Sequence, residues 1–386
     1  MSSDPIVREF DAALHKAERA LIERAKEFGH AVVAPAAEHW EHDRQVPTAA
    51  LRAACDAGLS GVELPKLWGG HGFRFSTKMR IVEELAKFDF GFAFSLVNHH
   101  NALVRLASAA PNLAARLVPR LLAGDIFGCS AYTEPGHGSD LAALETSAQR
   151  IDAGWELSGT KAWITNAAVA GVFVTLAQTE PGSRGKGVAS FVVEADRPGF
   201  HREAAYELQG GYSIGTGGFR LDRYRASDEA LLEAPGSGLQ SALERINGAR
   251  CYVAAMCAGM LESAIAQAVR SASQRRAFGR HTIEFQGLRW SLVDAHTDLA
   301  ALRLLAYRAA RAIDAGAPAE EEAARAKKFA GQRTLGHIAN CVQAMGAEGL
   351  RGEHVLMRHL MAAKIACFAD GTTEMMNERL GKIVAA

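Results

Sequence analysis

The sequence predicts an α+β multidomain fold in which a helical domain, a β domain and a helical bundle follow one another. In the first and last parts of the chain, apolar residues recur at the helical spacing of three and four. Between them lie short segments rich in β-branched and aromatic residues, separated by Gly, Pro, Asp and Ser. At 386 residues the chain is also too long for one small core. We therefore expect an N-terminal helical domain at 1–124, a middle antiparallel β-barrel-like domain at 125–234 and a C-terminal four-helix bundle at 235–386.

Helices account for the N-terminal domain. Residues 8–35 place their apolar side chains on one helical face, and Pro35 predicts the end of that helix. A second amphipathic segment at 51–65 leads into a glycine-rich turn at 67–73. Further helices, rich in alanine and leucine, are expected at 76–107 and 113–125.

The middle domain is predicted as a compact antiparallel sheet or small barrel. Its candidate strands are residues 155–159, 161–165, 172–178, 189–195 and 219–226. A turn rich in glycine at 180–187 joins two of them.

The C-terminal domain returns to long, alanine-rich helical segments. They cover residues 238–279, 285–316 and 319–346, and a last helix is expected to begin near Thr372. Gly316 and Pro318 give a stop signal after the second of these segments. Long helices with short links predict a bundle.

Composition excludes several classes of protein. The 43 basic and 43 acidic side chains give a formal net charge of zero, which argues against nucleic-acid binding. The six cysteines form no CxxC pair, as expected for reduced thiols in a cytosolic protein. The N-terminus lacks an apolar signal region, and no apolar run approaches the roughly 20 residues of a membrane helix. We therefore expect a cytoplasmic protein without a membrane span.

Two motifs in the middle domain could contact a ligand. The loop 130–140 combines the hydroxyls of Thr133 and Ser139 with glycines that let backbone N–H groups approach an anionic or carbonyl-rich group. In 161–165, Trp163 and Thr165 alternate, so an indole and a hydroxyl would share one strand face. Taken alone, these motifs are explained at least as well by a surface turn and a half-buried strand aromatic.

Two further motifs lie in the helical bundle. Arg275 offers a guanidinium suited to phosphate, although a helix end with a solvated basic face is the alternative. Gln343 and Gly346 precede a loop. After it, Asp370 stands before Gly-Thr, where an acid ordinarily caps a helix. None of these motifs is decisive by itself.

In this order and spacing, the four motifs resemble those of the acyl-CoA dehydrogenase family, over nearly the whole chain. The resemblance implies one FAD per subunit and assembly into a homotetramer or homodimer. It further implies an acyl-CoA substrate and an electron-transfer flavoprotein as the electron acceptor.

The resemblance also implies the residues that bind FAD. Trp163 and Thr165 match a Trp-Ile-Thr motif that covers the isoalloxazine ring, and Thr133 would bond the same ring. Arg275 and Phe278 look like a pair that binds the FAD of a neighbouring subunit. The full set of expected FAD contacts is Thr133, Ser139, Trp163, Thr165, Arg275, Phe278, Gln286, Gln343, Gly346, Thr372 and Glu374.

By the same resemblance, Asp370 is the catalytic base. It would remove the alpha proton of the thioester while the beta hydrogen leaves as hydride to the flavin, giving a 2-enoyl-CoA. This requires burial to raise the pKa of the carboxylate. The expected substrate contacts are Ser139, Asn247, Arg250 and Gly371.

The chain departs from the family pattern at several positions. The usual base is glutamate, so Asp370 is one methylene shorter, and Ala249 occupies the position where some members carry the glutamate instead. Aspartate at the main position resembles dehydrogenases of cyclic carboxyl-CoA substrates and nitroalkane oxidases. Other family positions are changed to Ala347, Met361, Ala362 and Tyr212.

Two alternative functions follow from these departures. One is a flavin oxidase acting on a small carbon acid such as a nitroalkane, and the other is a non-catalytic protein that binds flavin or CoA. His99 and His100 lie where the family's acyl chain runs. They are either packed helix residues or a second polar group that recognises a cyclic or functionalised acyl chain.

Overall fold

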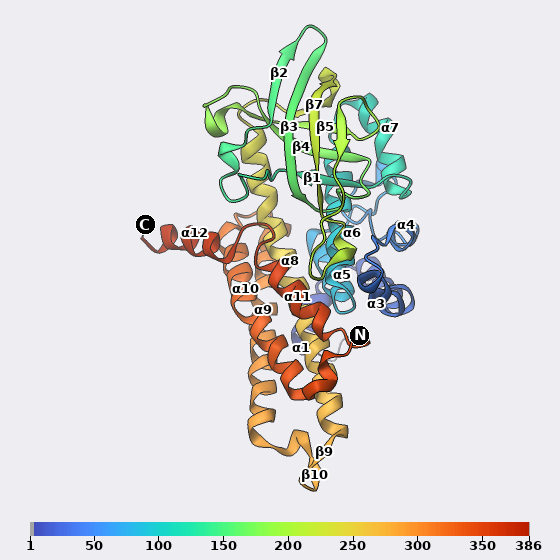
Figure 1. Ribbon diagram of the computed structural model, residues 1–386, viewed down its shortest axis with the longest axis vertical. Helices are drawn as coiled ribbons and strands as arrows, with labels where there is room; N and C mark the ends of the chain where they lie inside the picture. Colours follow the sequence, from blue (N-terminus) through green and yellow to red (C-terminus); the bar gives the residue numbers. More distant parts are fainter. Residues whose placement is uncertain (1–3, 386) are drawn as a thin grey trace.

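The structure is a computed structural model that describes residues 4–385, and it confirms the predicted order of helices, sheet and helical bundle (Figure 1). The domain boundaries at 124/125 and 234/235 stay predictions. The helices of the N-terminal part are α1 (Pro5–Ala12), α2 (Lys16–Phe28), α3 (Ala34–His42), α4 (Thr48–Asp56), α5 (Phe75–Ala86), α6 (Phe90–Leu106) and α7 (Pro111–Leu122).

The predicted helix end at Pro35 is wrong. The chain runs from α2 through a π-helical turn (Gly29–Val33) directly into α3, where Pro35 is the second residue. Proline is tolerated there because the first N–H groups of a helix have no partner within it. A π turn absorbs the change of hydrogen-bond pattern between the two helices.

The middle domain is one sheet, whose strands are β1 (Gly128–Ala131), β2 (Ser147–Ile151), β3 (Gly154–Ile164), β4 (Val172–Gln178), β5 (Val188–Glu194), β6 (Phe200–Arg202), β7 (Gly217–Ala226) and β8 (Leu231–Glu233). Their order is β6-β7-β3-β2-β4-β5-β8, and β1 pairs with β4. Most neighbouring strands are antiparallel, as predicted. Two pairings are parallel, namely that of β1 with β4 and the single bridge between β2 and β4. These parallel pairings were not predicted.

The C-terminal bundle consists of α8 (Gly238–Gln274), α9 (Gln286–Asp314), α10 (Glu320–Met345) and α11 (Leu356–Ala366). A short hairpin of β9 (Arg276–Ala277) and β10 (Arg280–His281) joins α8 to α9. The sequence prediction missed α11. The helix expected near Thr372 is α12 (Thr373–Ala385), which extends away from the body and buries only Met376 (Figure 1).

Helix α8 is the central helix of the fold. Within residues 4–385 it is the one helix that is long and apolar enough to cross a membrane, but 72% of its apolar window is buried inside the protein. Its apolarity is therefore explained by packing against its neighbours.

The N-terminal helices and the bundle share one hydrophobic core. Phe28, Phe92, Val253 and Leu302 belong to the same buried cluster. A second cluster packs the far half of α6, α7 and the sheet together. Because α6 contributes to both clusters, it ties the sheet to the bundle.

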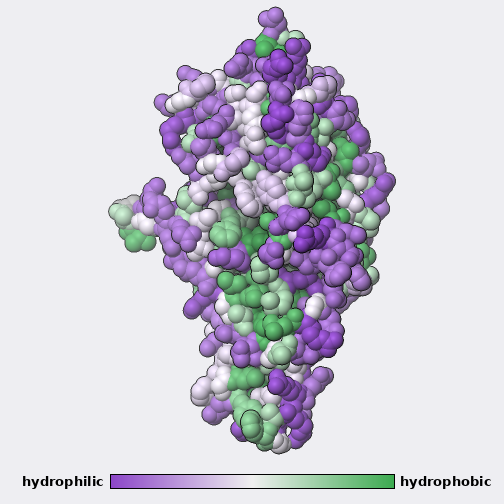
Figure 2. Space-filling model, in the orientation of Figure 1, coloured by the Kyte–Doolittle hydropathy of each residue, from purple (hydrophilic) through white to green (hydrophobic). Residues whose placement is uncertain are grey.

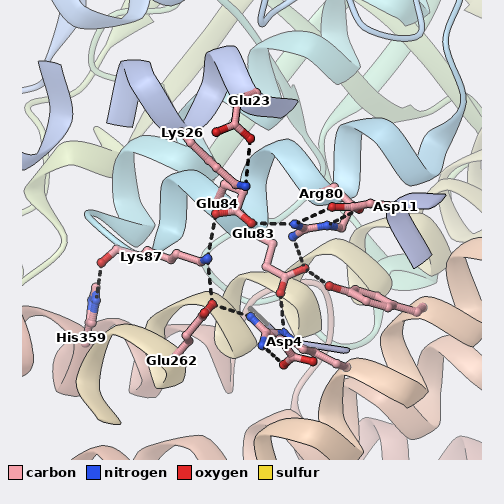
Figure 3. A network of polar contacts seen from close by, with 12 residues as sticks. Asp4, Asp11, Glu23, Lys26, Arg80, Glu83, Glu84, Lys87, Glu262 and His359 are labelled. Atoms are coloured by element: carbon pink, nitrogen blue, oxygen red, sulfur yellow. Dashed lines mark hydrogen bonds and ion pairs between the residues drawn. The ribbon is translucent and has the colours of Figure 1, made fainter. Parts of the chain in front are cut away.

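A network of buried charges reinforces this shared core (Figure 3). Arg80 on α5 is fully buried and donates to the carboxylates of Asp11, Glu83 and Glu84. Asp11 lies on α1, so this guanidinium connects α1 to α5. A buried guanidinium is tolerated because carboxylates occupy its donors.

Arg303 on α9 is the second buried guanidinium of the network. It donates to Asp4, Glu83 and Glu262, which lie before α1, on α5 and on α8. Lys87 joins Glu84 to Glu262 and closes the network. The network thus fixes α5 against both α8 and α9.

We predict that Arg303→Met destabilises the protein by about 3–5 kcal/mol, because it leaves buried carboxylates without their cation. Arg308→Met on the same helix is the matched control, since the Arg308 side chain is 72% exposed. Urea unfolding of both variants measures the difference. Equal unfolding midpoints for the two variants would contradict a stabilising role for the network.

Candidate functional site

Asp370 lies in the loop between α11 and α12, at a sharp turn of the chain. Asp370 has φ 55° and Gly371 has φ 100°, so two successive residues have positive φ. A non-glycine residue in this region is strained and persists only where the surroundings enforce it. The helix-cap interpretation of Asp370 is wrong, because the hydroxyl of Thr372 accepts the hydrogen bond from Met375 N in the first turn of α12.

The carboxylate of Asp370 is available to a ligand. Its Oδ2 atom is buried and has no hydrogen-bond partner among residues 4–385. Burial raises the pKa of Asp370 to about 6, although Lys327 and Arg250 oppose the shift. A carboxylate with this pKa is ionised at neutral pH yet basic enough to accept a proton.

Two cations bind the backbone of this turn and leave its carboxylate free. Arg250 Nε donates to the carbonyl oxygen of Asp370 at 3.2 Å, and Lys327 Nζ donates to that of Gly371 at 3.3 Å. Arg250 also donates to Asn247 Oδ1 at 2.8 Å. Burial lowers the pKa of Arg250 to about 10. The sequence prediction did not include Lys327, which resembles an ordinary solvated lysine on an alanine-rich helix.

The structure therefore brings together four of the five residues expected at the reaction centre, namely Asp370, Gly371, Asn247 and Arg250. A Cβ at Gly371 would lie 3.1 Å from Met376 Cε and 3.5 Å from an Arg250 nitrogen, so glycine suits this position in space as well as in φ. Ser139 is exposed on its loop, and no hydrogen bond within residues 4–385 joins it to the other four.

Trp163 lies on an accessible face of the middle domain. It has φ 60°, its side chain is 59% exposed, and its ring meets that of Tyr206 edge-on at 5.0 Å. The prediction that Thr165 shares a strand face with Trp163 is wrong, because β3 ends at Ile164 and carries a bulge between Lys161 and Ile164. The bulge breaks the two-residue alternation on which the prediction rested.

Thr133 lies beside this face because its carbonyl accepts a hydrogen bond from Ala162 N at 3.0 Å. Behind the loop, Glu134 is buried and accepts from Lys161 Nζ at 2.8 Å. Glu134 also accepts from the backbone of Thr146 at 2.9 Å. The sequence prediction missed this buried pair, because a single acid and a single lysine in loop and strand motifs ordinarily face water.

Arg275 borders a cavity of about 810 Å³ at the other end of the bundle, between α8 and the end of α10. It donates to the carbonyl oxygen of Met345 at 3.2 Å. Gly346 has φ 67°, which favours glycine, and a Cβ there would lie 2.7 Å from an Arg275 nitrogen, so the guanidinium would have to move. Gln267 lines the same cavity, and its buried Oε1 has no partner within residues 4–385.

The remaining residues expected to bind FAD are open to a ligand or a second chain. Phe278, in the β9–β10 hairpin, is 95% exposed at φ 50°. Gln286, Gln343 and Glu374 are exposed at helix termini. Figure 1 places the hairpin at the opposite end of the molecule from the middle domain. The 37 residues of α8 lie between these ends and span about 55 Å.

His99 is a packed histidine. Its Nε2 donates to the carbonyl oxygen of Leu121 at 3.0 Å, and its Nδ1 accepts from Gly128 N at 3.2 Å. Burial lowers its pKa to about 4, so it is neutral. His99 therefore joins α6 to α7 and β1 and is not available to a ligand.

Comparisons with known proteins agree with this arrangement. Residues 15–125, 129–224 and 236–385 match the models described as the N-terminal, middle and C-terminal domains of acyl-CoA dehydrogenase. An acyl-CoA dehydrogenase of Bacillus subtilis (strain 168) is 29% identical, with 92% of this chain and 95% of that protein covered. Benzylmalonyl-CoA dehydrogenase of Aromatoleum aromaticum is 30% identical over 97% of this chain and 100% of that protein.

Among solved structures, the butyryl-CoA dehydrogenase of Megasphaera elsdenii superposes with a TM-score of 0.92. It is 27% identical to this chain, and the match covers 97% of this chain and 99% of that one. The three domains of this chain are thus arranged as in a flavin-dependent dehydrogenase.

We predict that Asp370→Asn stabilises the folded protein at pH 8 by about 1–3 kcal/mol but not at pH 4. The pKa of Asp370 is raised from 3.8 to about 6, so the folded state binds the extra proton between these values and loses stability as pH rises through them. A neutral amide at this position would remove that loss. Thermal unfolding at both pH values measures it, with Asp152→Asn on an exposed turn as the control. A stabilisation that is equal at both pH values would contradict the raised pKa.

Proposed function

This chain belongs to the acyl-CoA dehydrogenase family, and we propose that it dehydrogenates the α,β bond of an acyl-CoA thioester with Asp370 as the base. The observation that supports this assignment most strongly is the buried, unpartnered Oδ2 of Asp370 in a strained turn. The two cations at the turn bind backbone carbonyls and leave the carboxylate free to act. The product is the 2-enoyl-CoA.

The proton step follows from the chemistry of this loop. Asp370 Oδ2 accepts the alpha proton, because a carboxyl group whose pKa is about 6 is mostly ionised at neutral pH. The backbone N–H of Asp370 makes no hydrogen bond within residues 4–385, so it can donate to the thioester oxygen as negative charge develops there. Arg250 and Lys327 bind the backbone carbonyl oxygens of this turn, and so fix the orientation of both the carboxylate and the N–H group of Asp370.

FAD, the cofactor of this family, supplies the two-electron acceptor when bound. The exposed indole of Trp163 and the adjacent loop at Thr133 fit the flavin ring. The cavity beside Arg275 fits the dinucleotide, since the guanidinium suits an anionic phosphate and the unpartnered Gln267 oxygen can accept from a hydroxyl or amino group. The residues of this chain therefore fit FAD.

One chain does not bring both of these regions to one cofactor, because the middle domain, which carries Trp163, and the β9–β10 hairpin next to Arg275 lie at opposite ends of the molecule. We therefore infer that Arg275, Phe278, Gln343 and Gly346 contact the FAD of a neighbouring subunit in a homotetramer or homodimer. The exposed side chains of Trp290, Val293 and Leu304 on α9 would be covered by such a neighbour. Figure 2 shows apolar residues gathered over the bundle half of the molecule. We further propose an electron-transfer flavoprotein as the acceptor of the electrons.

We predict that Asp370→Asn retains FAD but reduces the rate of flavin reduction by acyl-CoA by about 10²–10⁴-fold, because an amide cannot accept the proton. In the unaltered enzyme, this rate should rise with pH through about 6, since the base must be deprotonated. Anaerobic stopped-flow absorbance of the flavin measures both effects. An unchanged rate would refute the role of Asp370, and oxygen consumption with nitroalkanes but not acyl-CoAs would favour a carbon-acid oxidase.

We predict that Arg275→Ala weakens FAD binding by about tenfold or more and shifts the oligomer toward smaller species. Both effects follow if the guanidinium binds a cofactor shared between subunits. Cofactor retention on gel filtration and the mass from light scattering measure them, with the exposed Arg225→Ala as the control. Tight FAD in a stable monomer would contradict the shared site.

A further inference from the structure

A buried polar group lies within electrostatic reach of Asp370 and has no part in the steps above. It consists of Glu63, Lys78, His100, Asn101 and Tyr252, which we call the Lys78 cluster. Burial raises the pKa of Tyr252, and the nearby carboxylates of Asp370 and Glu63 raise it further, so its phenol lies near both acids. Tyr252 and Arg250 are both residues of α8.

Lys78 has a donor to spare. Its Nζ pairs with Glu63 and donates to Asn101 Oδ1 at 3.2 Å. The ammonium also lies 4.7 Å from the ring centre of Phe75 and 5.8 Å from that of Tyr252. An ammonium has three N–H groups, so the third faces these rings without an acceptor from residues 4–385.

Tyr252 likewise has a donor to spare. Its hydroxyl oxygen accepts from Asn101 Nδ2 at 3.2 Å, and Asn101 is held in this orientation because its Oδ1 accepts from Lys78. Burial raises the pKa of Tyr252 well above its usual value, so the phenol keeps its hydrogen. No acceptor within residues 4–385 takes that hydrogen.

His100 is held between Ser60 and Glu63. Its Nδ1 lies 2.5 Å from the carbonyl oxygen of Ser60, and its Nε2 lies 3.1 Å from a carboxylate oxygen of Glu63. The pKa of Glu63 is lowered to about 2 by Lys78 and His100 despite burial. Glu63 therefore stays ionised between these two side chains.

The cluster is not sealed from its surroundings, because the side chain of Glu63 is 24% exposed and that of Lys78 is 9% exposed. Asp370 is likewise only partly buried. A further acid near Glu63, Asp314, accepts from Ser76 N and faces Arg74, and it makes no hydrogen bond to Lys78.

These contacts disfavour a purely alkyl acyl chain. A hydrocarbon end placed against Lys78 and Tyr252 would leave two buried donors unpaired. A carboxylate would accept a hydrogen bond from both donors. The ammonium of Lys78 can bind such a carboxylate without leaving Glu63, because it has three donors.

We propose that the acyl group of the substrate carries a second carboxylate, remote from the thioester, which binds Lys78 and Tyr252. This inference rests on the proposed function and names the substrate class, a CoA thioester of a dicarboxylic acid. Lys78 and Tyr252 act here as specificity-determining residues, and Glu63, His100 and Asn101 position them. The sequence prediction considered His100 as a polar group that recognises the acyl chain. Its Nε2 instead contacts Glu63, so His100 supports the cluster and does not bind the carboxylate itself.

The test compares thioesters of equal shape that differ in charge. Glutaryl-CoA is paired with 5-methylhexanoyl-CoA, and adipoyl-CoA with 6-methylheptanoyl-CoA, since an isopropyl group replaces the carboxylate in each pair. Calorimetry measures binding to the FAD-loaded Asp370→Asn protein, where no turnover intervenes, and flavin bleaching is followed in the unaltered enzyme. We expect at least one carboxylate thioester to bind about 10- to 100-fold more tightly than its uncharged partner.

Lys78→Met should abolish this preference by weakening only the carboxylate thioester, and Tyr252→Phe should reduce it in part. Lys66→Met, at an exposed position of the neighbouring segment, should leave it unchanged. Equal or tighter binding of the uncharged partner in both pairs would overturn the inference, as would a preference that survives both Lys78→Met and Tyr252→Phe. If no acyl-CoA bleaches the flavin, the proposed function fails instead, and the binding ratio alone decides the carboxylate site.

Discussion

The two buried guanidinium groups of Arg80 and Arg303 are the constraint on which the site depends. Their carboxylate partners come from the chain before α1 and from α1, α5 and α8, so the network fixes helices from both ends of the chain against each other. Lys78 lies two residues before Arg80 on α5, whereas Arg250 and Tyr252 lie on α8. A charge network with no proposed chemical role thus sets the distance between the groups that we propose to bind the substrate.

The site itself uses cations to shape the backbone more than to neutralise an acid. Arg250 and Lys327 bind carbonyl oxygens on either side of the turn, which stabilises the positive φ of Asp370 and Gly371. If either cation bound the carboxylate directly, the pKa of Asp370 would fall and the base would weaken. Burial instead dominates, and the carboxylate keeps a raised pKa near 6. Strain, burial and charge therefore act on one residue together.

Sequence reasoning succeeded where a local pattern has one structural consequence and failed where a contact overrides it. Apolar periodicity predicted the order of helices, sheet and bundle, and Asn247, Arg250, Asp370 and Gly371 do meet. Pro35 did not end a helix, because a π turn lets it begin the next one. Thr165 does not share a strand face with Trp163, because a bulge interrupts β3.

The sequence by itself determined the family, the three-part architecture and the choice of Asp370 as the candidate base, because these depend on residue types at characteristic spacings along one chain. Only the tertiary structure decided which charges are buried together. Lys327, the Glu134–Lys161 pair and the Lys78 cluster look like ordinary surface residues in the sequence. Their roles arise because distant segments remove them from water, and the cost of burying a charge forces each one to find a partner.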